Sequence, residues 1–207
     1  MAAQTSDFIH KYFPADAPDG VTLLLLHGTG GNEMSLASLG QAIDRQAGQL
    51  SPRGKVSEGG ANRFFRRIAE GVYDMNDVAR RSEELANWIE AAREEYGIAA
   101  DKLVAVGYSN GANIAAAVLL RHPGVITRAV LVRAMMPVEG LSPDLSGTKI
   151  LMLAGQYDPL VPAGESERLA QAFEQFGADV TLDTLPTDHG ITNEDLVAAR
   201  TWIKHNS

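Results

Sequence analysis

The stretch Leu103–Leu119, LVAVGYSNGANIAAAVL, decides how this chain of 207 residues folds. It begins with the apolar run Leu103–Val106, which predicts a buried strand, and small apolar residues from Ala112 onward predict a buried helix. Only the pentapeptide GYSNG, residues 107–111, lies between the two. We therefore expect a strand, a very tight turn and a helix in immediate succession.

The pentapeptide fits G-x-S-x-G, the pattern of a nucleophile elbow. In such a turn the serine has a strained backbone with a positive φ and projects its hydroxyl above the sheet. Gly107 and Gly111 leave room for neighbouring backbone, and the first N–H groups of the helix stabilise negative charge beside Ser109. An ordinary turn rich in small residues is the alternative, but the strand–turn–helix setting favours a nucleophile at Ser109.

Composition limits the class of protein. The length and the lack of internal repeats predict one domain, residues 1–207. A formal charge of −8 argues against nucleic acid or an anionic membrane as the main partner, and the absence of cysteine excludes disulfides, thiolate metal sites and cysteine nucleophiles. No apolar run approaches the roughly 20 residues that span a membrane. Because Met1–Lys11 also lacks the pattern of a secretory signal, we expect a cytoplasmic protein without membrane insertion.

Strand and helix patterns alternate along the chain. Strands are expected at Val21–Leu26, Gln49–Pro52, Leu103–Val106, Arg128–Met136, Lys149–Ala154 and Val180–Leu185, with a weaker edge strand within Asp7–Ala15. Helices are expected at Met34–Ala47, Val78–Tyr96 (capped by Asn76 or Asp77), 110–121, Glu165–Phe176 and from Asn193 through Trp202. The glycine-rich stretch Pro52–Asn62 predicts a loop. This order predicts a mostly parallel sheet with helices on both faces, a three-layer α/β/α sandwich.

Four chemically distinctive stretches follow strands of this sheet. They are HGTGG (27–31), GYSNG (107–111), GQYD (155–158) and DH (188–189). Ligands of such sheets bind beyond the carboxyl ends of the strands, so we expect the four stretches to meet at one edge.

A serine nucleophile needs a base, and the base needs an orienting carboxylate. His189 is the histidine that lies in a loop after a strand and follows Ser109, as the order Ser…Asp…His requires. The other histidines have different interpretations: His10 and His205 lie near the chain ends, His122 follows a helix, and His27 fixes the glycine-rich loop.

Asp158 is the best candidate for the orienting acid because it ends a strand. Asp188 is adjacent to His189, so its side chain is expected to point away from the imidazole, and Asp183 lies within an alternating strand. The sequence therefore predicts the catalytic residues Ser109, Asp158 and His189.

Two backbone N–H groups are expected to stabilise an oxyanion. One belongs to Asn110, directly after the nucleophile, and the other to Thr29 in the glycine-rich loop. Gly28 and its neighbours let this loop approach the substrate closely. A phosphate-binding loop is the alternative, but neither G-x-G-x-x-G nor a following Gly-Lys-Ser/Thr is present.

The motifs LLLLHGTGGNE, VAVGYSNGAN, LAGQYDPLVP and DHG resemble α/β-hydrolases of the carboxylesterase/phospholipase branch, which includes small carboxylesterases and acyl-protein thioesterases. The resemblance implies the α/β-hydrolase fold, the same triad and oxyanion residues, and no metal or organic cofactor. It makes a homodimer plausible. LSPRGKV…RFFRR also resembles a bacterial subgroup linked to hydroquinone and catechol stress. Many relatives have Gln where this chain has Asn110, a change that leaves the backbone N–H available for the oxyanion.

The predicted function is hydrolysis of carboxylic esters through an acyl-enzyme. The alternatives are a lysophospholipase, an acyl thioesterase, a lyase or perhydrolase with the same triad, and a ligand-binding protein without activity. The short segment Val138–Thr148 leaves no room for a large cap domain, so an open site is expected.

Several further residues are candidates for substrate binding. Gly28, Phe65, Tyr73 and Met136, with Phe64 and Met135, are candidates to line an acyl groove, although core packing is the favoured interpretation of each large side chain. Arg63, Arg66 and Arg67 are candidates to bind an acidic group, but a solvated basic turn is favoured.

Overall fold

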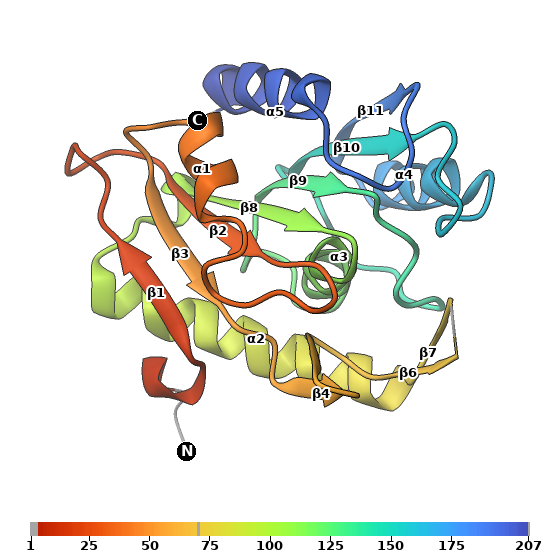
Figure 1. Ribbon diagram of the computed structural model, residues 1–207. Coiled ribbons are helices and arrows are strands. Elements are labelled where there is room, and N and C mark those ends of the chain that lie inside the picture. Colours follow the sequence, from red (N-terminus) through yellow and green to blue (C-terminus); the bar gives the residue numbers. More distant parts are fainter. Residues whose placement is uncertain (1–3, 70, 207) are drawn as a thin grey trace.

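A seven-stranded sheet forms the centre of the computed structural model, which describes residues 4–69 and 71–206. Its strand order is β1-β3-β2-β8-β9-β10-β11 (Figure 1). The strands are β1 (His10–Phe13), β2 (Thr22–Leu26), β3 (Gly48–Pro52), β8 (Leu103–Tyr108), β9 (Arg128–Val132), β10 (Lys149–Gly155) and β11 (Asp179–Leu185). Only β1 runs antiparallel to its neighbour among these described strands. The predicted mostly parallel sheet is confirmed.

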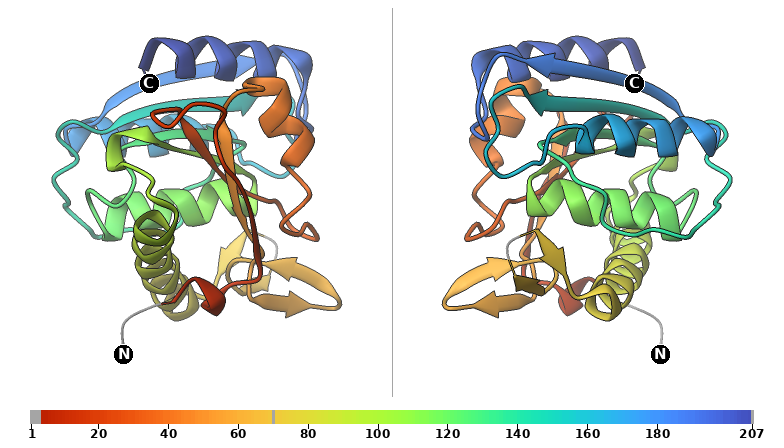
Figure 2. Two further views of the ribbon diagram at one scale, coloured as in Figure 1. Left: turned by 90° about the vertical axis from the view of Figure 1, so that its left-hand side faces the viewer. Right: turned by 90° about the vertical axis from the view of Figure 1, so that its right-hand side faces the viewer.

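Helices cover both faces of the sheet (Figure 2). The helices are α1 (Ala37–Ile43), α2 (Met75–Tyr96), α3 (Asn110–Arg121), α4 (Glu165–Gln175) and α5 (Asn193–Asn206), with single 3₁₀ turns at Thr5–Asp7 and Ala100–Lys102. Along β2, Leu23 and Leu25 pack on the side of α1 and α5, whereas Leu24 and Leu26 pack on the side of the other three helices. All four leucines are fully buried, as expected of a central strand of a three-layer sandwich.

The prediction of a loop at Pro52–Asn62 was wrong. Strands β4 (Val56–Glu58) and β5 (Ala61–Arg63) pair there as an antiparallel hairpin. Its two turn residues, Gly59 and Gly60, have φ of 57° and 88°, which is the conformation that a tight two-residue hairpin turn requires. A second short pair follows, β6 (Arg67–Ala69) with β7 (Val72–Tyr73).

Several predicted boundaries also need correction. Helix α2 begins three residues earlier than predicted, because Asp74, not Asn76 or Asp77, is its N-cap and accepts a hydrogen bond from the N–H of Asp77. Helix α1 is shorter than Met34–Ala47, since the side chain of Asn32 accepts from Met34 N–H and holds a turn there. Strand β9 ends at Val132 rather than Met136, because Arg133 has a φ of 56°.

Residues 133–148, between β9 and β10, contain neither a helix nor a strand. A cap domain is therefore not built from this segment, in agreement with the prediction. No helix within residues 4–69 and 71–206 is long and apolar enough to cross a membrane.

Candidate active site

Ser109 occupies a strained turn between β8 and α3. Its φ is 52°, and its N–H donates to Val132 O over 2.9 Å, which fixes the turn against the neighbouring strand. A Cβ on Gly111 would overlap the carbonyl of Leu26, and one on Gly107 would lie 2.7 Å from the Cα of Ala112. The two glycines are therefore required by close backbone contacts, as the sequence pattern indicates.

Ser109, His189 and Asp158 form a continuous hydrogen-bonded chain. His189 Nε2 lies 2.9 Å from Ser109 Oγ, and Nδ1 lies 2.7 Å from Asp158 Oδ2. The Asp158 side chain is buried, and its Oδ1 accepts from the N–H groups of Leu160 and Val161 at 2.8 and 3.1 Å. With a proton on Nδ1 held by Asp158, Nε2 is an acceptor for the hydroxyl proton of Ser109. The adjacent Asp188 points elsewhere and accepts from Gly190 N–H.

A buried arginine holds the loop that carries His189. Arg133 Nε donates to Asp188 O over 3.0 Å, and Nη2 donates to Gly190 O over 2.8 Å, so the bonds flank His189 on both sides. The guanidinium also donates to Leu153 O and twice to Asp195, so each of its five N–H donors has a partner. The hydroxyl of Tyr108 adds a bond to His189 O, and burial raises the pKa of this phenol.

His27 holds the glycine-rich loop in place, as predicted. Its Nε2 accepts from Gly54 N–H over 3.0 Å, and Nδ1 lies 2.7 Å from Gly28 O. Burial lowers the pKa of His27, so the ring stays neutral, with Nδ1 as the donor.

Residues of strand β5 also form hydrogen bonds to this glycine-rich loop. Gly30 N–H donates to Asn62 O, and Asn62 Nδ2 donates to Gly31 O, both over 2.8 Å. Arg63 Nη1 donates to the hydroxyl of Thr29 over 2.6 Å. Thr29 and Asn110, the predicted oxyanion residues, line one cavity together with Ser109 and His189.

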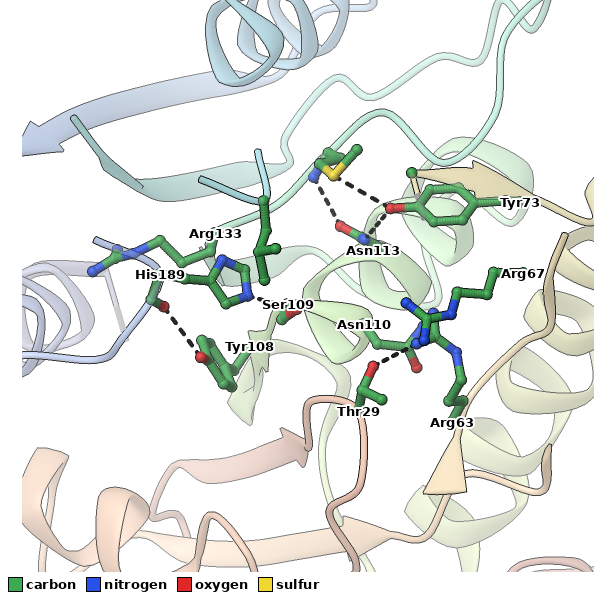
Figure 3. A pocket seen from close by; sticks show the side chains of 13 residues that line it. Thr29, Arg63, Arg67, Tyr73, Tyr108, Ser109, Asn110, Asn113, Arg133 and His189 are labelled. Carbon is green, nitrogen blue, oxygen red and sulfur yellow. Dashed lines mark hydrogen bonds between the residues drawn. The ribbon is translucent and has the colours of Figure 1, made fainter. Parts of the chain in front are cut away.

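This cavity has a volume of about 300 Å³ (Figure 3). Its described lining is Thr29, Arg63, Arg67, Gly71, Tyr73, Tyr108, Ser109, Asn110, Asn113, Arg133, Met135, Leu160 and His189. Within the described chain, no three His, Cys, Asp or Glu residues gather in a way that would hold a metal ion.

The predicted substrate-binding residues lie in different parts of the structure, and only some of them line the cavity. Tyr73 lines the cavity, whereas Phe65 is fully buried and packs edge-on against Tyr73, so core packing, the favoured interpretation, is confirmed for Phe65, and its candidacy as a substrate-binding residue was wrong. Met136 lies in a different cavity beside α4, which corrects the same prediction for that residue. Gly28 lies against the ring of Tyr108, where an added Cβ would approach Cδ1 to 2.9 Å.

The arginines after Asn62 differ in their exposure to solvent. Arg63 is 4% exposed, so the favoured interpretation as a solvated turn was wrong for it. Arg66 does fit that interpretation, since its exposed side chain pairs with Asp74 over 3.0 Å.

The sequence did not predict that Asn113 and Arg133 line the cavity. Asn113 lies one turn after Ser109, next to the apolar run Ile114–Leu120 of α3, and it donates to Tyr73 OH and accepts from Met135 N–H, both at 2.8 Å. Arg133 interrupts an apolar run. A polar residue within or beside an apolar segment was the available signal in both cases.

Known proteins are similar to nearly the whole chain. Residues 65–207 match the family model described as phospholipase/carboxylesterase. MhqD of Bacillus subtilis (strain 168), described as a hydrolase, is 43% identical over 183 residues, which is 88% of this chain and 92% of MhqD. The crystal structure of the Bacillus cereus carboxylesterase is 38% identical, with a TM-score of 0.92 over 95% of this chain and 93% of that one. The structure of YahD with malic acid is 26% identical, with a TM-score of 0.88 over 95% of this chain and 99% of YahD.

Proposed function

Because the chain belongs to the phospholipase/carboxylesterase family of α/β-hydrolases, we propose that it hydrolyses small carboxylic esters through an acyl-enzyme formed on Ser109. The observation that carries this proposal is the chain of hydrogen bonds from Ser109 Oγ to His189 (2.9 Å) and from His189 to Asp158 (2.7 Å). This arrangement supports Ser109 as the nucleophile, His189 as the base and the buried Asp158 as the orienting carboxylate, and Ser109 and His189 line the same cavity.

The first half of the reaction acylates Ser109. His189 Nε2 takes the hydroxyl proton while Oγ attacks the ester carbonyl carbon, which forms a tetrahedral intermediate. The backbone N–H groups of Thr29 and Asn110 stabilise its oxyanion, and removal of one such donor typically costs about 3 kcal/mol of transition-state stabilisation. His189 then gives its proton to the departing alcohol oxygen, which leaves the acyl group on Ser109.

The second half releases the acid. Water enters in place of the alcohol, and His189 removes a proton from it as it attacks the acyl carbonyl. Collapse of the second tetrahedral intermediate returns the proton from His189 to Ser109. Asp158 stabilises the imidazolium in both halves, because its buried carboxylate accepts the Nδ1 proton throughout.

The size and lining of the cavity support short, polar acyl groups. A volume of about 300 Å³ lies at the lower end of the range for ligand sites, and arginine, tyrosine and asparagine side chains contribute to its lining. A lysophospholipase or long-chain thioesterase needs a longer apolar groove, so both are less favoured. YahD was solved with malic acid, a small polar acid, which supports the same size class. Cytoplasmic location and dimer formation stay predictions.

The test is hydrolysis of p-nitrophenyl esters from acetate to decanoate by wild-type protein and by Ser109→Ala. We expect the highest kcat/KM at short chains, and a loss of at least about a thousandfold in kcat for the variant, with an unchanged circular dichroism spectrum. A maximum at octanoate or beyond would move the substrate to lipids or thioesters. Wild-type turnover by Ser109→Ala would overturn the proposal.

A further inference from the structure

The chain around the end of β5 forms hydrogen bonds to both loops that carry the predicted oxyanion residues. Toward the glycine-rich loop after β2, Asn62 O accepts from Gly30 N–H and Asn62 Nδ2 donates to Gly31 O, both over 2.8 Å. Toward α3, Phe64 N–H donates to Oδ1 of Asn110 over 2.7 Å. One short segment therefore joins two loops that follow different strands of the central sheet.

The residue between these two, Arg63, makes a further bond to the same glycine-rich loop. Its Nη1 donates to Thr29 Oγ1 over 2.6 Å, and Glu58, on β4, lies 3.6 Å from its Nε. A Cβ on Gly54 would lie 2.4 Å from the carbonyl of Arg63, so the backbone of β5 packs directly on the chain that leaves β3. The segment is therefore firmly held, although β4 and β5 form a two-stranded sheet of their own.

The side chain of Asn110 makes its bond to Phe64 at a cost. Asn110 is 2% exposed, and because an N–H of Phe64 can only donate, the amide must turn Oδ1 toward it. The buried Nδ2 is left without a partner among the described residues, and an unpaired buried donor costs free energy. Satisfaction of the amide alone does not explain this contact. The position of the Asn110 backbone, directly after the nucleophile, gives a reason for it.

An oxyanion is stabilised by two N–H groups only if both are already aimed at the place where its charge develops. The two groups here belong to Thr29 and Asn110, on separate loops, and the loop of Thr29 has the sequence HGTGG, in which the glycines add little stiffness. Figure 3 shows Thr29 and Asn110 on the side of Ser109 away from His189, with Arg63 beside them. A tie between the two loops would hold the pair of donors before the substrate arrives.

We propose that residues 62–64 set the distance between the N–H groups of Thr29 and Asn110, and that the side chains of Asn62 and Asn110 are positioning residues for the oxyanion. The proposal rests on the function proposed above and concerns the transition state of the same site. Asn62 is not among the described residues that line the cavity, so its effect on turnover passes through the loops that it holds. Its loss should weaken binding of the transition state and leave binding of the ester unchanged.

The test uses Asn62→Ala, Asn110→Ala and their combination. Asn32→Ala is the matched control, because the exposed Asn32 lies just after the same glycine-rich loop and its side chain accepts from Met34 N–H, on the side of α1. Thermal melts choose a temperature at which every variant is folded. If the buried Asn110 is needed for folding, Asn62→Ala, at a half-buried position, decides the question.

Two measurements separate the transition state from the ground state. Hydrolysis of ethyl butyrate is followed by pH-stat titration, since its poor leaving group makes acylation limiting and brings KM close to the dissociation constant. Inhibition by 1,1,1-trifluoro-2-butanone reports on the oxyanion. Ser109 Oγ bonds to the ketone carbon, the hydroxyl proton passes to His189, and the carbonyl oxygen becomes an oxyanion that resembles the intermediate.

We expect each single variant to lose about ten- to a hundredfold in kcat, with KM changed by less than about threefold, because a displacement of about 1 Å can cost about a hundredfold in rate. The inhibition constant of the trifluoromethyl ketone should rise by about the factor by which kcat/KM falls. Asn32→Ala should change neither. The double variant should lose less than the product of the single losses, because both variants release the same pair of N–H groups.

Two results would overturn the inference. One is a kcat of Asn62→Ala equal to that of Asn32→Ala, and the other is a loss of kcat/KM without a rise in the inhibition constant. In either case Ser109-dependent hydrolysis by the wild type leaves the proposed function intact. Absence of Ser109-dependent hydrolysis by the wild type would instead overturn the function, and this inference with it.

Discussion

Asp158 shows how much a single residue contributes at this site. Its carboxylate accepts the Nδ1 proton of His189 over 2.7 Å and thereby leaves Nε2 as an acceptor for Ser109. An amide in its place would turn an N–H toward Nδ1 and favour the wrong tautomer.

We therefore predict that Asp158→Asn lowers kcat by at least about a thousandfold with little change in unfolding free energy, since Oδ1 still accepts from Leu160 and Val161. Asp188→Asn is the matched control, because its carboxylate bonds to Gly190 N–H and not to His189. Steady-state kinetics on p-nitrophenyl acetate distinguish the two. An Asp158→Asn enzyme as active as Asp188→Asn would contradict the assignment.

Gly111 shows the steric cost of the elbow. A Cβ there would overlap the backbone carbonyl of Leu26, which cannot move without displacing β2. Gly124 has a φ of 90° but nothing within 4 Å of an added Cβ.

Gly111→Ala should lose more than about 4 kcal/mol of unfolding free energy, or fail to fold, whereas Gly124→Ala should lose about 1–2 kcal/mol. Urea titrations followed by tryptophan fluorescence measure both. Equal losses of unfolding free energy in the two variants would show that the close approach of α3 to β2 does not exclude a Cβ at residue 111.

At the scale of elements, Arg133 joins β9 to the loop after β11 and to the start of α5. Its side chain is fully buried with Asp195, and it also donates to the carbonyls on both sides of His189. Removing only the arginine would leave a buried carboxylate without its partner, which typically costs about 3–5 kcal/mol.

Arg133→Met should therefore be strongly destabilised, while Arg133→Met combined with Asp195→Leu should recover much of the stability, because no unpaired charge is left. The double variant should still have a kcat lowered by about tenfold or more, since the loop that carries His189 has lost two of its anchors. Its KM should change less than its kcat. A stable double variant with wild-type kcat would limit Arg133 to a structural role.

The elements predicted from sequence are those with a strong local pattern. The apolar runs of β2, β8 and β10, and the loops that follow them, correctly predicted the sheet and the stretches that meet at its edge. The β4–β5 hairpin was missed because strands of three residues give almost no alternation. With the hairpin missed, the burial of Arg63 could not be expected. The pairing of Arg133 with Asp195 joins residues 62 positions apart, for which one sequence gives no signal.

At the scale of the whole molecule, the site exists only when the sheet is assembled, since its residues follow β2, β8, β10 and β11, and β9 lies between β8 and β10. Global stability is therefore a condition for activity, and two histidines, the buried His27 and the half-buried His122, make that stability depend on pH. Burial lowers the pKa values of His27 and His122 below the ordinary 6.5, so the folded protein resists their protonation.

The sign of this effect follows from proton uptake. Unfolded chains bind protons at these histidines near pH 6.5 and folded ones only at lower pH, so the contribution of the two histidines to the free energy of unfolding is largest above pH 6.5 and falls as the pH decreases below it. His27→Gln should make this slope shallower by at most about 1.4 kcal/mol per pH unit, the value for one proton. Urea unfolding across this range measures it. An unchanged slope in His27→Gln would exclude His27 as a contributor.

The central claim is that Ser109 is the nucleophile, and covalent labelling tests it most directly. Intact protein is treated with a fluorophosphonate, and the modified peptide is identified by mass spectrometry. We predict one adduct, on Ser109, absent in Ser109→Ala and formed at least about a hundredfold more slowly in His189→Gln. An adduct on another residue, or unchanged labelling of Ser109→Ala, would contradict the account.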